Sequence, residues 1–169
     1  MRKTPMSIGC LVVIFAAVAC GGGNGEKGTV AEPGATPAAA KGAAYDCEYF
    51  TMTVASGWEA SPENMGMVNI LPKGQSSPGL YFKFEGKGNA VGTAEASIES
   101  MITRYEGSPM ESTTVGGVEF KTTTYVYGGS AQTMHVAFRE GTKITITIEG
   151  RDGKDNPDIQ AMLGSVSFK

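Results

Sequence analysis

The chain has 169 residues, of which 14 are basic and 17 acidic, so its formal net charge is −3. Removal of a leader covering Met1–Ala19 would take away two basic residues and no acidic ones, which brings the charge to −5. An acidic surface disfavours nucleic acid, whose phosphates need a basic partner, and it does not attract anionic lipid. We therefore expect no nucleic-acid partner, and any membrane attachment has to come from acyl chains.

The start of the chain has the pattern of a secretory signal peptide. Arg2 and Lys3 precede the apolar run Ile8–Ala19, which is too short to span a bilayer as a helix. Cys20 follows the small residues directly, which resembles the lipobox of bacterial lipoproteins and implies that Cys20 is acylated and becomes the new N-terminus. Ala17 stands where such motifs usually have Leu. Cleavage by ordinary signal peptidase, giving a soluble secreted protein, is therefore the alternative.

The segment after Cys20 predicts a tether. Gly21–Ala44 consists almost entirely of Gly, Ala, Pro, Thr and charged residues, and cannot bury enough surface to offset its chain entropy. We expect a disordered linker over 20–44 and a single domain over 45–169. Gly21, in place of Asp, favours the periplasmic face of the outer membrane over the inner membrane. In the lipidated form Cys47 has no partner for an internal disulfide.

The domain begins with a strand-rich half. Apolar residues alternate with Thr and Ala over Phe50–Ala55, which predicts a strand that Gly57-Trp58 breaks. Met65–Leu71 and Leu80–Glu85 predict two more strands. Thr93–Glu106 is then typical of a helix, because its apolar residues recur at helical spacing after an N-capping Thr.

The second half predicts a meander and a final helix. Gly-rich turns separate the expected strands Glu111–Val115, Val118–Tyr127, Ala131–Arg139 and Thr142–Glu149. Asn156-Pro157 predicts a helix start and Gly164 its end, before a short apolar edge at Val166 and Phe168. Together these elements predict an α+β fold with an antiparallel sheet of about six to seven strands and two packed helices.

Several short motifs resemble a known family. They are an opening strand (Phe50, Met52, Gly57-Trp58), a hairpin (Val115–Glu119) and a closing segment (Ile159, Met162, Leu163, Ser165, Val166 and Phe168). Over Asp46–Lys169 the chain resembles the Mog1/PsbP-like fold, in particular small bacterial lipoproteins of the DcrB and DUF1795 type. The resemblance implies an antiparallel sheet with helices packed on it, and it implies no activity. Members of known function act as assembly or binding factors.

The residues do not predict a catalytic or metal site. His135 is the single histidine, and its alternation with Met134 and Val136 predicts that it lies on the polar face of its strand. No motif places a nucleophile beside it. One His with one Cys, Cys47, is too small a ligand set for zinc. We therefore expect no enzyme activity, no metal and no cofactor.

Exposed aromatic residues are the candidates for a partner surface. Trp58, Tyr81, Tyr125 and Tyr127 fall mostly off the predicted apolar faces, and Tyr and Trp often anchor interfaces. The alternative is that Trp58 packs under the first strand and the tyrosines cover the sheet. The polar sheet face is either partly open or covered by a helix on these tyrosines.

Two functions remain open at this point. The first is a membrane-anchored envelope lipoprotein that acts as a non-catalytic protein-binding or assembly module, with an envelope protein as its partner. The second is a small-ligand carrier with a pocket between helix 94–106 and the sheet, lined by Phe82, Phe84, Met101 and Tyr105.

Overall fold

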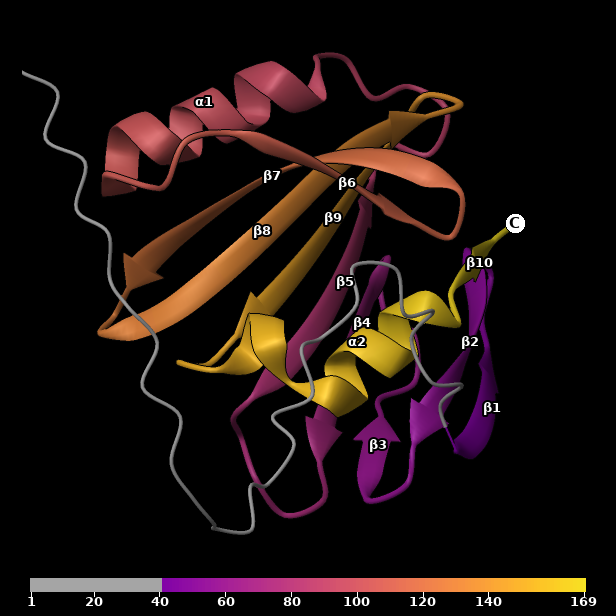
Figure 1. Cartoon of the computed structure of the whole chain (residues 1–169). Coiled ribbons are helices and arrows are strands. Elements are labelled where there is room, and N and C mark those ends of the chain that lie inside the picture. Colours follow the sequence, from indigo (N-terminus) through magenta and orange to yellow (C-terminus); the bar gives the residue numbers. More distant parts are fainter. Residues whose placement is uncertain (1–40) are drawn as a thin grey trace, which may run out of the picture. The chain divides into compact units, whose positions relative to one another are not determined.

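A computed structural model describes residues 41–169 of the chain. The predicted signal peptide over 1–19, Cys20 and the tether up to residue 40 lie outside the described residues. The described part is an α+β fold with two antiparallel sheets and two α-helices (Figure 1).

A large sheet of seven strands forms the body of the fold. Its strand order is β3-β4-β5-β9-β8-β7-β6, and every neighbouring pair is antiparallel. The strands are β3 (Trp58–Ala60), β4 (Met67–Pro72), β5 (Gly79–Glu85), β6 (Glu111–Val115), β7 (Val118–Tyr127), β8 (Ser130–Arg139) and β9 (Thr142–Glu149). A second sheet of three strands has the order β1-β2-β10, with β1 (Gly42–Asp46), β2 (Phe50–Ala55) and β10 (Ser167–Phe168).

Tight turns set the register of the long strands. Two-residue turns at Gly116-Gly117, Gly128-Gly129 and Glu140-Gly141 join β6 to β9 in sequence, and all six residues have positive φ angles. Turns of this type match the right-handed twist of paired strands. The last turn pairs Arg139 with Thr142 and therefore Ala137 with Ile144, so these two side chains lie on the same face.

One face of the large sheet contributes to the main core. Phe82, Ile146 and Phe120 are at most 1% exposed there. Helix α2 (Pro157–Gly164) and the three-stranded sheet are part of the same cluster, and Phe50 of β2 stacks on Phe82 with ring centroids 4.5 Å apart. Each such fully buried side chain contributes on the order of 1.5–3 kcal/mol of transfer free energy.

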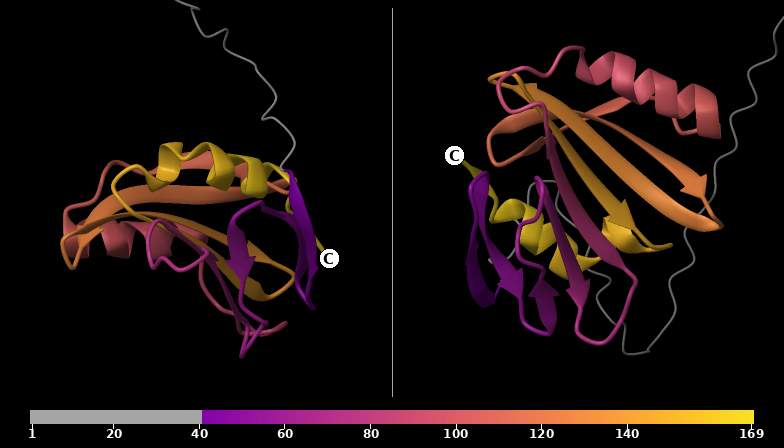
Figure 2. Two further views of the ribbon diagram at one scale, coloured as in Figure 1. Left: turned by 90° about the horizontal axis from the view of Figure 1, so that it is seen from below. Right: turned by 180° about the vertical axis from the view of Figure 1, so that it is seen from behind.

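Helix α1 (Ala94–Tyr105) lies on the opposite face, over β7 and β8 (Figure 2). Thr93 caps it, since its hydroxyl oxygen accepts a hydrogen bond of 3.1 Å from the backbone N–H of Ala96. Ile98 is its fully buried residue. Because β8 is covered here by α1 and on its other face by the core, it carries apolar residues on both faces.

The α+β class, both helices and the succession of the main strands along the chain are confirmed. Two short strands are additional to those predicted. β1 takes Gly42–Ala44 from the end of the expected tether, and β3 begins at Trp58, where the sequence predicted only a break. The small sheet forms because β10 pairs with β2, which are more than one hundred residues apart in the chain, a pairing that local patterns do not reveal.

Trp58 connects β3 to the start of α2. The side chain is 8% exposed, and its indole Nε1 donates a hydrogen bond of 3.0 Å to Oδ2 of Asp158. Asp158 also lies in the first turn of α2, where a carboxylate interacts favourably with the helix dipole. This contact therefore ties the end of the large sheet to the helix that covers its core face.

We predict that Asp158→Ala lowers the free energy of unfolding by about 1–2 kcal/mol, because it leaves the indole N–H without its acceptor. Chemical denaturation followed by the fluorescence of Trp58, the single tryptophan, measures this loss. Asp155→Ala is the matched control, since Asp155 is exposed one turn earlier and is expected to change stability by no more than a few tenths of a kcal/mol. Equal losses in the two variants would contradict the assigned contact.

Candidate functional site

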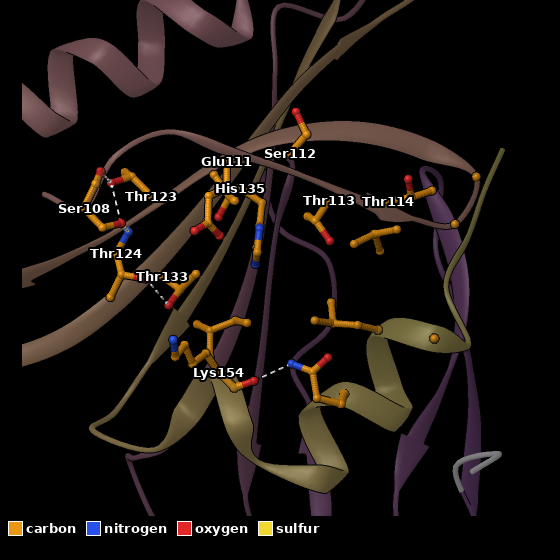
Figure 3. Close-up of a pocket in the computed structure, with 18 residues that line it drawn as sticks. Ser108, Glu111, Ser112, Thr113, Thr114, Thr123, Thr124, Thr133, His135 and Lys154 are labelled. Carbon is orange, nitrogen blue, oxygen red and sulfur yellow. Dashed lines mark hydrogen bonds between the residues drawn. The ribbon is translucent and has the colours of Figure 1, made fainter. Parts of the chain in front are cut away.

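Two hollows lie on opposite faces of the large sheet. The first, which we call the hydroxyl pocket, has a volume of about 530 Å³ and lies between β6–β8 and the segment that contains α2 (Figure 3). Eight of its 18 lining residues are serine or threonine. Its charged lining residues are Glu111 on β6 and Lys154 of the short 3₁₀-helix η1 (Gly153–Asp155), and both are exposed.

The floor of the hydroxyl pocket holds two buried polar side chains. Thr122 of β7 and His135 of β8 are cross-strand partners, and each is 8% exposed. Within residues 41–169, the Thr122 hydroxyl and both ring nitrogens of His135 have no hydrogen-bond partner. Leaving such a group unpaired costs about 1–3 kcal/mol. The next cross-strand pair outward, Thr124 and Thr133, differs in that its hydroxyls lie 3.1 Å apart and bond to each other.

The predicted exposed position of His135 is wrong. Its neighbours Met134 and Val136 do share a face, but that face is the one under α1, across from Thr147 and Thr145 of β9. His135 pairs with Ile146 and therefore belongs to the core face. The two-residue turn at Glu140-Gly141 was the available signal, because it determines which residues of β8 and β9 lie side by side.

Burial makes His135 a neutral side chain. Desolvation lowers its pKa from 6.5 to about 4, because the charged form loses its hydration in the pocket floor. At pH 7 the imidazole therefore offers one N–H donor and one acceptor nitrogen. Figure 3 shows the ring reaching into the pocket, with Glu111 beside it and Lys154 across the space.

The second hollow, which we call the α1 groove, has a volume of about 630 Å³. α1 walls it on one side, where Met101 lines it, and the uncovered strands β4, β5 and β9 form its floor. Tyr81, Lys83 and Glu149 line this floor. Burial, and secondly the Glu149 carboxylate, raise the pKa of Tyr81. Within residues 41–169, the polar face of the sheet is thus covered by α1 over β7 and β8 and left open over β5 and β9.

The carrier pocket predicted between helix 94–106 and the sheet has a different lining from the expected one. Met101 lines the α1 groove, whereas Phe84 and Tyr105 do not. Phe82 borders the groove, but its ring is 1% exposed and stacks on Phe50 in the core. Phe84 lies on the core face, where it stacks on Tyr49 at 4.3 Å. Tyr105 packs against Tyr125 at 5.2 Å, at the other end of the helix.

The four predicted surface aromatics do not form one patch. Trp58 and Tyr125 are 8% and 6% exposed, so their expected exposure is wrong. Trp58 belongs to the core cluster, whereas Tyr125 lies under α1 and donates a hydrogen bond of 2.9 Å to Gln132. Tyr81 is half-buried in the α1 groove, and Tyr127 is 57% exposed. Tyr81 and Tyr127 therefore remain available to a partner.

Solved structures identify the fold. The solution structure of cyanobacterial PsbP (CyanoP) from Synechocystis sp. PCC 6803 matches with a TM-score of 0.53 and 15% identity, covering 84% of this chain and 100% of that chain. The fold is PsbP-like. A Bacteroides thetaiotaomicron protein matches with a TM-score of 0.49 and 11% identity over 71% of this chain, which spans 45% of that protein. No family model and no curated protein matches the chain.

The described part of this PsbP-like domain can be checked for metal ligands, membrane-spanning helices and reactive side chains. Residues 41–169 contain no group of three or more His, Cys, Asp and Glu side chains placed to hold a metal ion. In the same range no helix is long and apolar enough to cross a bilayer. Cys47 is half-buried, and its Sγ lies 3.6 Å from the carbonyl oxygen of Phe50. Within the described residues, neither ring nitrogen of His135 bonds to a hydroxyl or thiol.

We predict that the PsbP-like domain loses about 2 kcal/mol of stability between pH 7 and pH 5 because of His135. The unfolded chain protonates near pH 6.5, whereas the folded protein resists protonation down to about pH 4. Between these values the unfolded state binds more protons, so the stabilisation is complete above pH 6.5 and is lost as the pH falls towards 4. Denaturant unfolding at both pH values measures the difference.

The matched variant for this measurement is His135→Gln, which keeps a polar side chain and cannot titrate. Its own loss between pH 7 and pH 5 should be smaller than that of the unmodified chain by about 2 kcal/mol. Because each protein is compared with itself, a lower absolute stability of the variant does not affect the result. An equal pH dependence in both proteins would show that His135 is not held neutral by burial.

Proposed function

We propose that this chain is a lipid-anchored, non-catalytic binding module of the bacterial envelope, of the DcrB type within the PsbP-like fold. Cys20 carries the acyl chains and so attaches the protein to a membrane, and Gly21 favours the periplasmic face of the outer membrane. The linker after Cys20 lets the domain reach an envelope protein near the membrane surface. Two or more acyl chains are sufficient for stable anchoring without a basic surface.

The observation that carries the binding role is the open α1 groove. Sheet faces that stay uncovered are normally polar and solvated. Here the uncovered floor combines Tyr81 with charges of both signs, Lys83 and Glu149, and Met67 is 45% exposed at its border. A half-buried aromatic ring surrounded by polar groups is typical of protein interfaces, where Tyr anchors the contact and charges set its orientation.

The state of His135 supports a non-catalytic role. Nucleophilic catalysis by Ser or Cys requires a base within hydrogen-bonding distance of the nucleophile. In the described range 41–169 neither ring nitrogen of His135 bonds to a hydroxyl or thiol, and burial keeps the pKa of the ring far below the range useful to a general base at neutral pH.

The anchor is tested by Cys20→Ala, which we expect to move the protein from the membrane fraction to the soluble fraction, because no acyl chain can then be attached. Membrane fractionation with and without detergent measures the distribution. Cys47→Ala is the matched control and should stay with the membrane. Retention of Cys20→Ala in the membrane fraction would contradict the lipid anchor.

A small-ligand carrier remains the second candidate, because the α1 groove is large and Met101 and Met134 give it an apolar part. A photo-crosslinking residue in place of Met67, at the border of the groove, distinguishes a protein partner from a carried small molecule in the cells that produce the protein. A protein partner predicts a crosslinked band of one defined larger mass, whereas a carried molecule predicts an increase of a few hundred daltons or less. The control position is Val91, which is 96% exposed outside the groove and should give neither product.

A further inference from the structure

The hydroxyl pocket is on the core side of the large sheet, and the proposed function makes no use of it. Its floor is the cross-strand pair Thr122 and His135, two side chains that are each 8% exposed and lack a hydrogen-bond partner within residues 41–169. The neighbouring cross-strand pair Thr124 and Thr133 differs, because its two hydroxyls lie 3.1 Å apart and bond to each other. Both side chains line a hollow of about 530 Å³, and each unpaired atom exposes less than 1 Å² of its own surface. A small rotation of these side chains would present the unpaired atoms to a molecule bound in the hollow.

The chemistry of the floor selects the class of ligand. The Thr122 hydroxyl can both donate and accept, and neutral His135 supplies one donor and one acceptor. A bound anion would have one favourable charged neighbour, Lys154, and one unfavourable one, the carboxylate of Glu111. A bound cation would have no cluster of acidic groups to bind it among the described residues. Groups that donate and accept at the same atom, namely hydroxyls, complement this floor without bringing a charge into it.

The walls fit the same class. Ile148 and Leu163 give the pocket an apolar side next to its hydroxyl-rich side. Sugars and cyclic polyols have hydroxyl groups around a C–H framework, so they present both kinds of surface. The volume lies within the usual range of small-molecule sites.

We propose that the hydroxyl pocket is a binding site for a small uncharged polyol or sugar, whose hydroxyl groups bond to Thr122 and His135. This site lies on the opposite face of the sheet from the α1 groove and requires neither the lipid anchor nor a protein partner. If the pocket binds no sugar or polyol, the proposed lipid-anchored binding role is therefore unaffected. If that role is wrong, the pocket proposal is likewise unaffected.

The test uses the imidazole signal of His135, which is unambiguous because the chain has a single histidine. The mature full chain is titrated with D-glucose, D-galactose, N-acetylglucosamine, myo-inositol and glycerol, each at up to high millimolar concentration. Inorganic phosphate and glycine serve as anionic and zwitterionic comparisons. We expect a saturable shift of the ring resonances with at least one neutral probe and none with phosphate or glycine. No saturable shift with any neutral probe, or a shift with phosphate or glycine alone, would overturn the proposal.

Two hydroxyl-bearing residues of β7 provide matched variants. Thr122→Val removes the unpaired hydroxyl at nearly constant volume, so it should leave the protein as stable as before or more stable, and weaken binding of the responding probe by about ten-fold or more. Tyr125→Phe, on the opposite face of the same strand and outside the pocket, removes a hydroxyl that donates a 2.9 Å hydrogen bond to Oε1 of Gln132. It should lower stability and leave probe binding unchanged.

Thermal unfolding of both variants completes the test. Unchanged probe binding by Thr122→Val would overturn the proposal. A marked loss of stability in Thr122→Val would overturn it as well, because the hydroxyl would then be satisfied in the unliganded fold and would not be available to a ligand.

Discussion

The structure depends on the pairing of β8 with β9 at the centre of the large sheet. Their connecting turn aligns Ala137 with Ile144 and His135 with Ile146, so the isoleucines of β9 face the core together with alternate residues of β8. The remaining residues of β8, Val136 among them, then face α1. A slip of one residue would exchange the two faces and expose both apolar sets. The two helices and the small sheet can pack only because this register holds.

The same constraint creates both hollows. α1 is 12 residues long and covers β7 and β8, so the more distant strands β5 and β9 stay open and form the α1 groove. On the other face, the core cluster includes α2 and the small sheet, and the hydroxyl pocket remains between α2 and β6. The two surfaces proposed for binding are therefore areas of the sheet that no helix or strand within residues 41–169 covers.

A PsbP-like fold at 15% identity carries no activity with it, because unrelated functions share common folds. Function depends instead on local chemistry. Lipidation of Cys20, as proposed, would account for the membrane attachment of an acidic protein. The α1 groove offers an aromatic and charged surface, and the buried pair Thr122 and His135 has uncharged hydrogen-bonding groups. Each of these features can be lost without the others, so each can be examined separately.

Local patterns in the sequence were sufficient for the fold class, both helices and the main strands. Thr93 and Asn156-Pro157 begin their helices through contacts within one turn, and glycine turns end the strands. The carrier pocket and the aromatic surface were less predictable. Placing Phe84 or Trp58 requires knowing which face α1 covers, and alternation alone shows that two faces differ without saying which one a helix will occupy.

The sequence by itself determined the leader pattern, the acidic charge and the alternation of each strand, since these depend on composition and near neighbours. Only the tertiary structure decided that His135 is buried and neutral. Its environment is made by β6, β7, β9 and α2, segments brought together by packing over long distances in the chain. The pKa of a side chain follows from the atoms around it, and those atoms are known only once the register and the helices are in place.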